Sequence, residues 1–283
     1  TAQWTSTAFT VEKLDDVVYN GQSQQLEPVV KDANDNKITL NKGTDYTVSY
    51  SKDTTNVGKV TVTITGAGNY IGEVKKTYQI TRRPVTFTGN SDTKTYNGTE
   101  QSVTGCTSTK LAEGKGLLAD TTSNVEASAR GTDFGSYPGT ITEAEKVVLT
   151  HDGKDVTGNY LITTEPGTLT IEKSDKLLIQ AAAADSRAKV YDGTALEVGA
   201  TVSPAEGTTV QYTTDGGETW KEEIPSITDA GTVHVTAKAT NSNYSNTPEV
   251  EYDLTVTQRP VTFTGNSDTK TYNGTEQSVT GCT

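Results

Sequence analysis

Residues 83–107 read RPVTFTGNSDTKTYNGTEQSVTGCT, and residues 259–283 repeat this stretch letter for letter. The two copies are 25 residues long and begin 176 positions apart, which establishes internal duplication. Repetition at a fixed period is the sequence signature of modular arrays. We therefore expect tandem modules, with the last 25 residues forming the truncated start of a module that occurs complete earlier in the chain.

Two short motifs divide the chain further. A Tyr-(Asn/Asp)-Gly triplet occurs four times, and each of the first three triplets is followed by an Asn-Tyr pair and an alternating segment. This order predicts complete modules at residues 1–82, 83–175 and 176–258, and the start of a fourth at residues 259–283. Asn, Asp and Gly tolerate positive φ, and Tyr joins a large apolar ring to a polar tip, so we expect turns and cores here. The residues given these structural roles are Tyr19, Asn20, Gly21, Asn69, Tyr70, Tyr96, Asn97, Gly98, Asn159, Tyr160, Tyr191, Asp192, Gly193, Asn243 and Tyr244.

Within the modules, periodic segments predict strands, and the fold class is mostly β. Residues 59–65 (KVTVTIT) alternate apolar and Thr side chains, as expected for a sheet with one buried face. Turn-forming residues at 32–36 and 214–218 predict hairpins. Short helices are expected at residues 111–120 and 142–148. Residues 176–189 are rich in Ala, but the repeat alignment predicts a strand there.

Composition and charge exclude several classes of partner. The chain has 283 residues and a formal net charge of -12, which repels phosphate backbones and anionic lipid head groups. No apolar run approaches the roughly 18 residues of a membrane-spanning helix, and residues 1–10 lack the features of a signal peptide. We therefore expect no nucleic-acid partner and no membrane insertion in this segment. Because the chain contains no Met, we expect it to be part of a longer or processed protein.

The joints between modules are short and contain proline. Residues 82–85 (RRPV) and 258–261 (QRPV) connect the last strand of one module to the first strand of the next. Proline fixes its own φ and favours extended geometry in the preceding residue, so these joints should be stiff. The expected arrangement is an elongated array in which each module has neighbouring repeats of the same chain as partners.

The ordered motifs resemble a known family of repeats. The MBG, or "mostly β-grasp", repeats of bacterial surface proteins are matched by VYNGQ at 18–22, GTDYTVSY at 43–50, TNVG at 55–58 and ITGAGNY at 64–70. The related YDG repeats are matched by KVYDGTAL at 189–196, and by VTGNY at 156–160 with GTLTI at 167–171. The resemblance covers nearly the whole chain. It implies tandem β-grasp-like modules of large secreted or wall-attached adhesins, without catalytic residues.

No group of residues predicts a catalytic, cofactor-binding or metal site. Cys106 and Cys282 occupy equivalent positions in different repeats, so we expect inert thiols rather than a disulfide. His151 and His234 are isolated, whereas metal and triad sites need several converging ligands.

Three further groups leave an alternative open. Residues 32–36 faintly resemble a calcium loop but lack its sixth-position Gly and closing Glu, so turn formation is favoured. The recurring tyrosines and Trp220 could form a sugar-stacking platform, although a core role is favoured. Lys189 and Asp192 could form an isopeptide crosslink if a buried carboxylate joined them.

These observations favour a structural role over an enzymatic one. The predicted function is a stalk or spacer of a secreted or cell-wall-attached bacterial surface protein that projects a distal head. Neighbouring first and last strands in each module would resist a pull by shear. The alternatives are a module that binds extracellular glycans or host proteins, or an accessory region of a large extracellular hydrolase. Residues 259–283 are expected to be poorly packed or to borrow a neighbouring strand edge.

Overall fold

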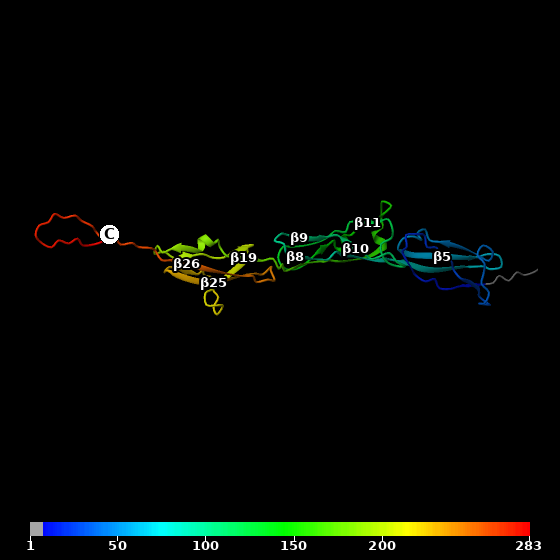
Figure 1. The fold of residues 1–283 in the computed structure, drawn as a ribbon. Coiled ribbons are helices and arrows are strands. Elements are labelled where there is room, and N and C mark those ends of the chain that lie inside the picture. Colours follow the sequence, from blue (N-terminus) through cyan, green and yellow to red (C-terminus); the bar gives the residue numbers. More distant parts are fainter. Residues whose placement is uncertain (1–7) are drawn as a thin grey trace, which may run out of the picture. The chain divides into compact units, whose positions relative to one another are not determined.

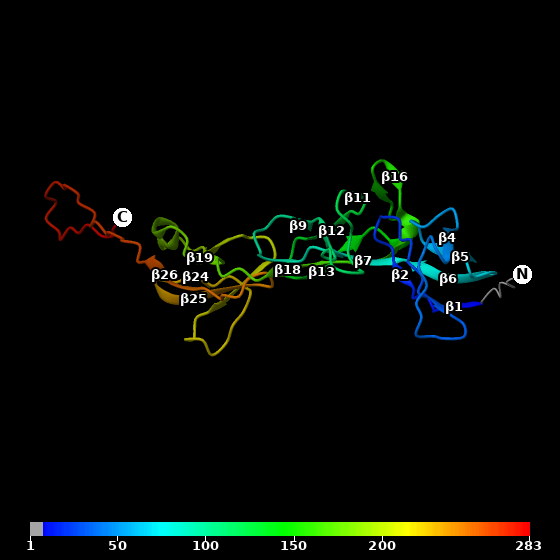
Figure 2. The ribbon, with the colours of Figure 1, turned by 90° about the vertical axis from the view of Figure 1, so that its right-hand side faces the viewer.

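The computed structural model describes residues 8–283; residues 1–7, most of the stretch inspected for a signal peptide, lie outside the described residues. The fold is mostly β, and residues 8–283 contain no α-helix (Figures 1 and 2). Within that range, no helix has the length and apolar character needed to span a membrane. The chain forms two compact units: one ends at Ile171 and omits residues 95–97, and the other holds residues 95–97 and 172–283.

The first repeat contains two sheets around one core. Its strands are β1 (Phe9–Val11), β2 (Val17–Val18), β3 (Val30–Asp32), β4 (Tyr46–Tyr50), β5 (Gly58–Gly66) and β6 (Glu73–Thr81). Strands β2, β6, β5 and β4 form one sheet in that order, and β1 pairs with β3. Val60, Val62 and Ile64 of β5 are fully buried, which confirms the alternation predicted for residues 59–65. Burial of each such side chain contributes about 1.5–3 kcal/mol.

The second repeat shares that hydrophobic core. Its strands are β7 (Arg83–Gly89), β8 (Asp92–Thr95), β9 (Gln101–Thr104), β10 (Cys106–Ser108), β11 (Thr121–Ser123), β12 (Ala127–Gly131), β13 (Gly135–Pro138), β14 (Thr140–Ile141), β15 (Leu149–His151), β16 (Lys154–Asp155), β17 (Tyr160–Glu165) and β18 (Thr168–Glu172). Strand β7 lies between β10 and β17, and it runs parallel to β17 over six residue pairs. Val85, Phe87 and Leu149 belong to the same cluster of buried side chains as the core of the first repeat.

The third repeat has a separate core in the second unit. Its strands are β19 (Leu178–Gln180), β20 (Ala188–Val190), β21 (Leu196–Glu197), β22 (Thr201–Ser203), β23 (Thr208–Thr213), β24 (Ser226–Ile227), β25 (Gly231–Asn241) and β26 (Glu249–Thr257). The sheet order β20-β26-β25-β23 repeats the order β2-β6-β5-β4 of the first repeat. Val235, Ala237 and Leu254 are fully buried in the core of this unit.

One pairing recurs in all three repeats. The strand that precedes each Tyr-(Asn/Asp)-Gly triplet lies beside the last strand of the repeat: β2 beside β6, β8 beside β18 and β20 beside β26. The β2–β6 and β20–β26 pairs are parallel. The very first strands, β1 and β19, pair elsewhere. In each repeat, the last strand therefore has the second strand of the repeat as a neighbour in the sheet. We had expected the first strand in that position.

The predicted helices are wrong. Residues 111–120 form turns, because Gly114, Gly116 and Asp120 adopt positive φ, which a right-handed helix excludes. Residues 142–148 contain one short 3-10 turn, η1 (Ala144–Lys146). The strand predicted for residues 176–189 is found in part: β19 and β20 flank the 3-10 turn η3 (Ala184–Arg187). A further 3-10 turn, η2 (Thr157–Asn159), precedes β17.

Candidate functional site

A buried arginine lies at the joint between the first two repeats. Strand β6 ends at Thr81 and β7 begins at Arg83, whose side chain is only 4% exposed. Its Nε donates to the Gly116 carbonyl at 2.7 Å, and its Nη2 donates to the Ala112 and Lys115 carbonyls, each at 2.6 Å. Its Nη1 donates to the Tyr19 carbonyl of the first repeat at 3.3 Å. Four main-chain oxygens thus satisfy a charge that would be costly to bury alone.

The local sequence explains why this arginine points inward. Arg83, Val85, Phe87 and Gly89 alternate along β7 on its buried face. The loop that receives the guanidinium can turn tightly because Gly116 has φ +82°. A Cβ atom at Gly116 would lie 2.4 Å from the Lys110 carbonyl oxygen, so only glycine fits.

Two tyrosines from different repeats meet at the same joint. The rings of Tyr19 and Tyr160 are 5.6 Å apart and edge to face, at an interplanar angle of 73°. The Tyr19 N–H donates to the Thr81 carbonyl at 3.0 Å, which extends the β2–β6 pairing to the joint. The Tyr160 hydroxyl accepts from the Leu118 N–H at 3.4 Å. Burial, and then the Tyr160 hydroxyl, raises the pKa of Tyr19, while the Asn159 side chain lowers it by less.

The buried Asn159 adds a polar clamp between the repeats. Its side-chain oxygen accepts from the Val57 N–H at 2.9 Å, and its side-chain nitrogen donates to the Asn56 oxygen at 2.9 Å. Both partners belong to the TNVG motif of the first repeat. We refer to the contacts of Tyr19, Asn56, Val57, Arg83, Asn159 and Tyr160 as the first joint.

The first joint is suited to fixing orientation. Its hydrogen bonds are directional, and its apolar rings belong to the core that both repeats share. The four hydrogen bonds of Arg83 described above all end on main-chain carbonyls, which carry no titratable proton. The geometry therefore predicts a rigid connection between the first and second repeats.

Three further motif tyrosines also have partners. Tyr96 and Tyr244, both in the second unit, have rings 5.4 Å apart at an angle of 80°. The Tyr70 hydroxyl donates to Asp32 Oδ2 at 2.8 Å. Asp32 also accepts from the N–H groups of Asn34 and Asp35, so residues 32–36 form a side-chain-capped turn. These backbone bonds and the Tyr70 hydroxyl lower the pKa of Asp32.

The Asn or Asp of the triplets makes the same local turn. The side-chain oxygens of Asn20, Asp192 and Asn273 each accept from the N–H two residues later, at 2.9, 2.9 and 3.1 Å. The following glycines Gly21, Gly98 and Gly193 all have φ +81°. Asn69, Asn97 and Asn243 complete the motif set; the Asn243 carbonyl accepts from the Ser174 N–H at 3.0 Å. The triplets therefore form turns at these positions.

Lys189 and Asp192 form an ion pair. Lys189 Nζ lies 2.8 Å from Asp192 Oδ1, and it also donates to the Thr194 carbonyl at 2.6 Å. The Lys189 hydrogen bond is the main cause that holds the pKa of Asp192 well below its usual range. The two side chains are 21% and 51% exposed, so this pair closes the Tyr-Asp-Gly turn at the surface and not in the buried site that an isopeptide crosslink would need.

The remaining candidate residues do not converge. Cys106 and Cys282 are free thiols. His234 contacts Asp253 at 2.8 Å across β25 and β26, and His151 contacts Thr121 at 3.3 Å. Among residues 8–283, no three His, Cys, Asp or Glu side chains are grouped so that they could hold a metal ion.

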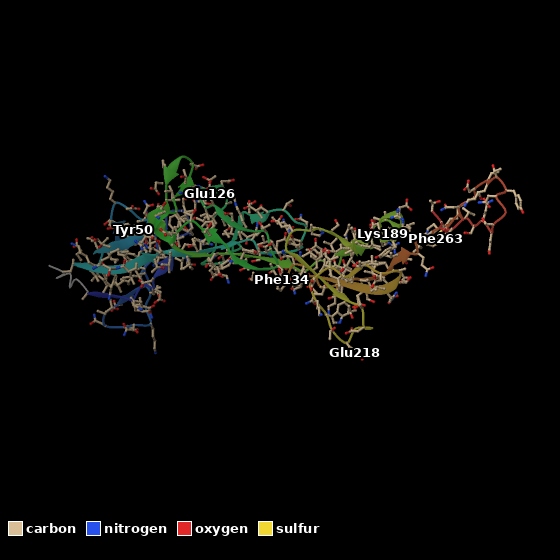
Figure 3. All side chains as sticks on the ribbon, turned by 90° about the vertical axis from the view of Figure 1, so that its left-hand side faces the viewer. Tyr50, Glu126, Phe134, Lys189, Glu218 and Phe263 are labelled. Carbon is tan, nitrogen blue, oxygen red and sulfur yellow. The ribbon has the colours of Figure 1, made fainter. Side chains whose placement is uncertain are left out.

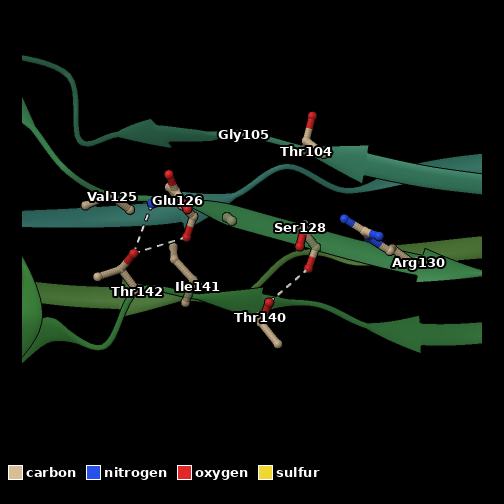
Figure 4. Close-up of a pocket in the computed structure, with 10 residues that line it drawn as sticks. Thr104, Gly105, Val125, Glu126, Ser128, Arg130, Thr140, Ile141 and Thr142 are labelled. Atoms are coloured by element: carbon tan, nitrogen blue, oxygen red, sulfur yellow. Dashed lines mark hydrogen bonds between the residues drawn. The ribbon is translucent and has the colours of Figure 1, made fainter.

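An open groove of about 610 Å³ crosses the sheet formed by β14, β12 and β9 (Figure 4). Thr142 bonds to Glu126 and Thr140 bonds to Ser128 along its floor. The ten lining residues include no aromatic ring. One face of the Trp220 indole is covered, because Lys238 Nζ lies 3.9 Å from the ring centroid.

Sequence reasoning missed the role of Arg83. We attributed the stiffness of the joint to Pro84, whereas the buried guanidinium makes the contacts. The period of two that places Val85 and Phe87 inward also places Arg83 inward, so the pattern itself contained the signal.

Comparisons with known proteins give little further information. No known family profile matches the chain, and no curated protein matches it. Among solved structures, protocadherin gammaB7 EC3-6 is 9% identical, with 88% of this chain and 76% of that chain covered and a TM-score of 0.34. The human desmocollin-1 ectodomain is 10% identical, with 93% and 64% covered and a TM-score of 0.26. The N-terminal four Ig domains of Dscam1 are 10% identical, with 89% and 73% covered and a TM-score of 0.25. TM-scores of this size do not define a common fold.

Proposed function

We propose that this chain is a non-catalytic stalk or spacer segment of a secreted or cell-wall-attached bacterial surface protein. Its tandem β-grasp-like modules form an elongated array that holds a distal functional part away from the cell. The observation that carries this proposal is the first joint, where a buried arginine with four main-chain bonds fixes one repeat to the next. A spacer needs such joints, because reach is lost wherever two modules can fold back on each other.

The strand pairing supports a load-bearing role. The second strand of a repeat, which precedes the triplet, lies beside the last strand, and β2 and β6 are parallel neighbours over two residue pairs. Opposite pulls on parallel neighbours load all of their hydrogen bonds together, whereas a hairpin opens one bond at a time. The β20–β26 pair offers the same geometry in the third repeat.

Small-angle scattering of the full chain tests the spacer role. A compact chain of 283 residues would have a radius of gyration of about 19 Å. We expect a clearly larger value and a distance distribution with a long tail. The Arg83→Ala variant should broaden that distribution, and Arg82→Ala should leave it unchanged, because Arg82 is exposed. A compact wild-type particle would contradict the proposal.

Single-molecule pulling on the full chain tests the load-bearing role separately. We expect one cooperative event per complete module, each lengthening the chain by up to about 280 Å for some 80 residues. Gradual extension without resolved events would refute this part. Glycan-array binding that Trp220→Ala abolishes would instead favour the glycan-binding alternative.

A further inference from the structure

Two tyrosine pairs follow one rule across the repeats. Tyr19 belongs to the triplet of the first repeat, and its partner Tyr160 belongs to the Asn-Tyr pair of the second. Tyr96 belongs to the triplet of the second repeat, and its partner Tyr244 belongs to the Asn-Tyr pair of the third. In both cases the triplet tyrosine of one repeat stacks edge to face on the Asn-Tyr tyrosine of the next repeat.

Tyr191, the triplet tyrosine of the third repeat, occupies the position equivalent to Tyr19, but its ring is exposed. The Tyr191 N–H donates to the Thr257 carbonyl at 2.8 Å, as the Tyr19 N–H does to Thr81 at 3.0 Å. The side chain of Tyr191 is nevertheless 40% exposed, whereas that of Tyr19 is 4% exposed. A Cβ atom at Gly21 would touch the Leu118 side chain, but one at Gly193 would meet nothing within 4 Å.

The segment that follows gives a second, independent observation. Residues 259–265 have the sequence of β7 but form no strand, and Val261 and Phe263 are 69% and 76% exposed (Figure 3). Their counterparts Val85 and Phe87 are 2% and 3% exposed. What covers the first copy is known: β17 pairs with it along six residues, and the Thr109 N–H and Gly116 N–H donate to the carbonyls of Thr86 and Pro84.

We propose that Tyr191 and residues 259–265 form a docking surface for a polypeptide with the sequence of residues 108–171, the segment that covers the identical first copy. By equivalence with the first joint, Arg259 donates to the Tyr191 carbonyl and to the turn that corresponds to residues 112–116. Val261 and Phe263 pack under a strand equivalent to β17. The ring of Tyr191 stacks on the tyrosine equivalent to Tyr160.

The third repeat also keeps the partners of the Asn159 clamp. Where the first repeat has Thr55-Asn56-Val57-Gly58, the third has Thr228-Asp229-Ala230-Gly231, immediately before or at the start of the equivalent strand. Asp229 retains a side-chain oxygen that can accept from an asparagine amide, and Ala230 retains the main-chain N–H. Both residues are exposed. This docking inference does not depend on the stalk role, because the surface can bind whether or not the protein bears load.

Hydrogen exchange on the full chain, with a polypeptide of residues 108–171 as the probe, tests the proposal. The two identical copies yield identical internal peptides, so the readout is a peptide of residues 253–263, whose first residues are unique to the third repeat. We expect the probe to slow exchange at residues 259–263 by about tenfold. It should also slow the reaction of Cys282 with a thiol reagent in the Cys106→Ser variant.

Matched variants separate specific docking from general stickiness. Tyr191→Ala and Arg259→Ala should abolish the protection, while Gln258→Ala, next to Arg259, should retain it. A probe carrying Asn159→Ala and Tyr160→Ala should bind more weakly than the wild-type probe.

If the free probe binds too weakly to protect the chain, a probe joined covalently to the chain tests the surface. The same sequence appended after Thr283 reaches an effective concentration in the millimolar range. Protection only in the appended form still supports the surface. Exchange at residues 259–263 as fast as in the unextended chain, or equal protection in the Tyr191→Ala and Arg259→Ala chains, overturns the proposal.

Discussion

Residues 83–107 and residues 259–283 share one sequence and differ in structure. In the first copy, residues 83–89 form β7 between β10 and β17 and bury Val85 and Phe87. In the second copy, drawn in red at the end of the chain in Figure 1, the same residues form no strand. Of the two outcomes expected for this segment, poor packing or pairing with a neighbouring strand edge, the structure shows the first. Because the sequences are identical, the difference comes from what surrounds them.

The local contacts survive in both copies. Gly89 faces Cys106 in the first copy, and Gly265 faces Cys282 in the second. The side-chain amides of Asn90 and Asn266 donate to the carbonyls of Thr104 and Thr280 at 3.0 and 3.1 Å. The comparison teaches that the hairpin is encoded locally, whereas burial and extended strand pairing require residues 108–165.

The largest expected contrast comes from one substitution made at both positions. Phe87→Ala should lower the free energy of unfolding of the first unit by about 3–5 kcal/mol, because it opens a cavity in a packed core. Phe263→Ala should change the stability of the chain by less than about 0.5 kcal/mol, because its ring is already exposed. Urea denaturation followed by circular dichroism measures both, and equal effects would break the comparison.

The arginines give the next largest contrast. Arg83→Ala should lower the free energy of unfolding by about 3 kcal/mol, because four main-chain carbonyls lose a charged donor. Arg259→Ala and Arg82→Ala serve as controls, and each should change the free energy of unfolding by nearly zero. Hydrogen exchange should show faster opening around residues 156–162 in Arg83→Ala alone. A joint stiffened by proline would instead leave these residues protected in that variant.

Because Tyr252 of the third repeat is buried, we expect a smaller effect of pH on the free energy of unfolding. Burial, and then the Tyr212 hydroxyl, raises the pKa of Tyr252 to about 12, against 10.0 in the unfolded chain. The folded state therefore holds its proton longer. The stability that Tyr252 contributes is fully present below pH 10 and declines as the pH rises toward 12, with a loss of roughly 1 kcal/mol at pH 11.

Urea denaturation between pH 8 and pH 11 measures this slope. Tyr252→Phe should remove the contribution of Tyr252 to the fall of the unfolding free energy with pH. It should also lower that free energy by a constant amount at every pH, because the hydrogen bond to the Val198 carbonyl is lost. Removing residues 259–283 should not alter the slope, because that segment leaves its own apolar side chains exposed. An unchanged slope in Tyr252→Phe would contradict the assignment.

The smallest contrast concerns the two thiols. Burial raises the pKa of Cys106, and Cys282 is exposed. The chain that keeps only Cys282 should react with a disulfide reagent at pH 8 faster than the chain that keeps only Cys106, on the order of several-fold to tenfold. Cys106→Ser and Cys282→Ser provide the two single-thiol chains. Similar rates would show that the first copy opens as readily as the second.

Much of the fold was predictable from local patterns. The alternation in residues 59–65 predicted the buried face of β5, and the triplets predicted turns with positive φ at Gly21 and Gly193. These features depend on residues close in sequence. At residues 111–120, tertiary contacts such as the carbonyls that the 112–116 turn presents to Arg83 outweigh helix propensity. At residues 142–148, only the 3-10 turn η1 forms.

The candidate site was predictable only in part. The motif residues Tyr19, Asn159 and Tyr160 were singled out, but nothing local in the sequence indicated that a triplet tyrosine meets the Asn-Tyr tyrosine of the next repeat. That pairing joins residues more than 100 positions apart and depends on how two repeats pack. The modular stalk, its β-grasp-like architecture and its bacterial surface location stay predictions.

The sequence by itself determined the repeat, the strands, the turns and the hairpin contacts of Asn90 and Asn266, because each depends on neighbouring residues and on the period of two along a strand. Only the tertiary structure decided which copy of the 25 residues is buried and that Arg83 holds the joint. Burial of an apolar side chain, or of a charge, requires a second surface, and that surface comes from distant parts of the chain.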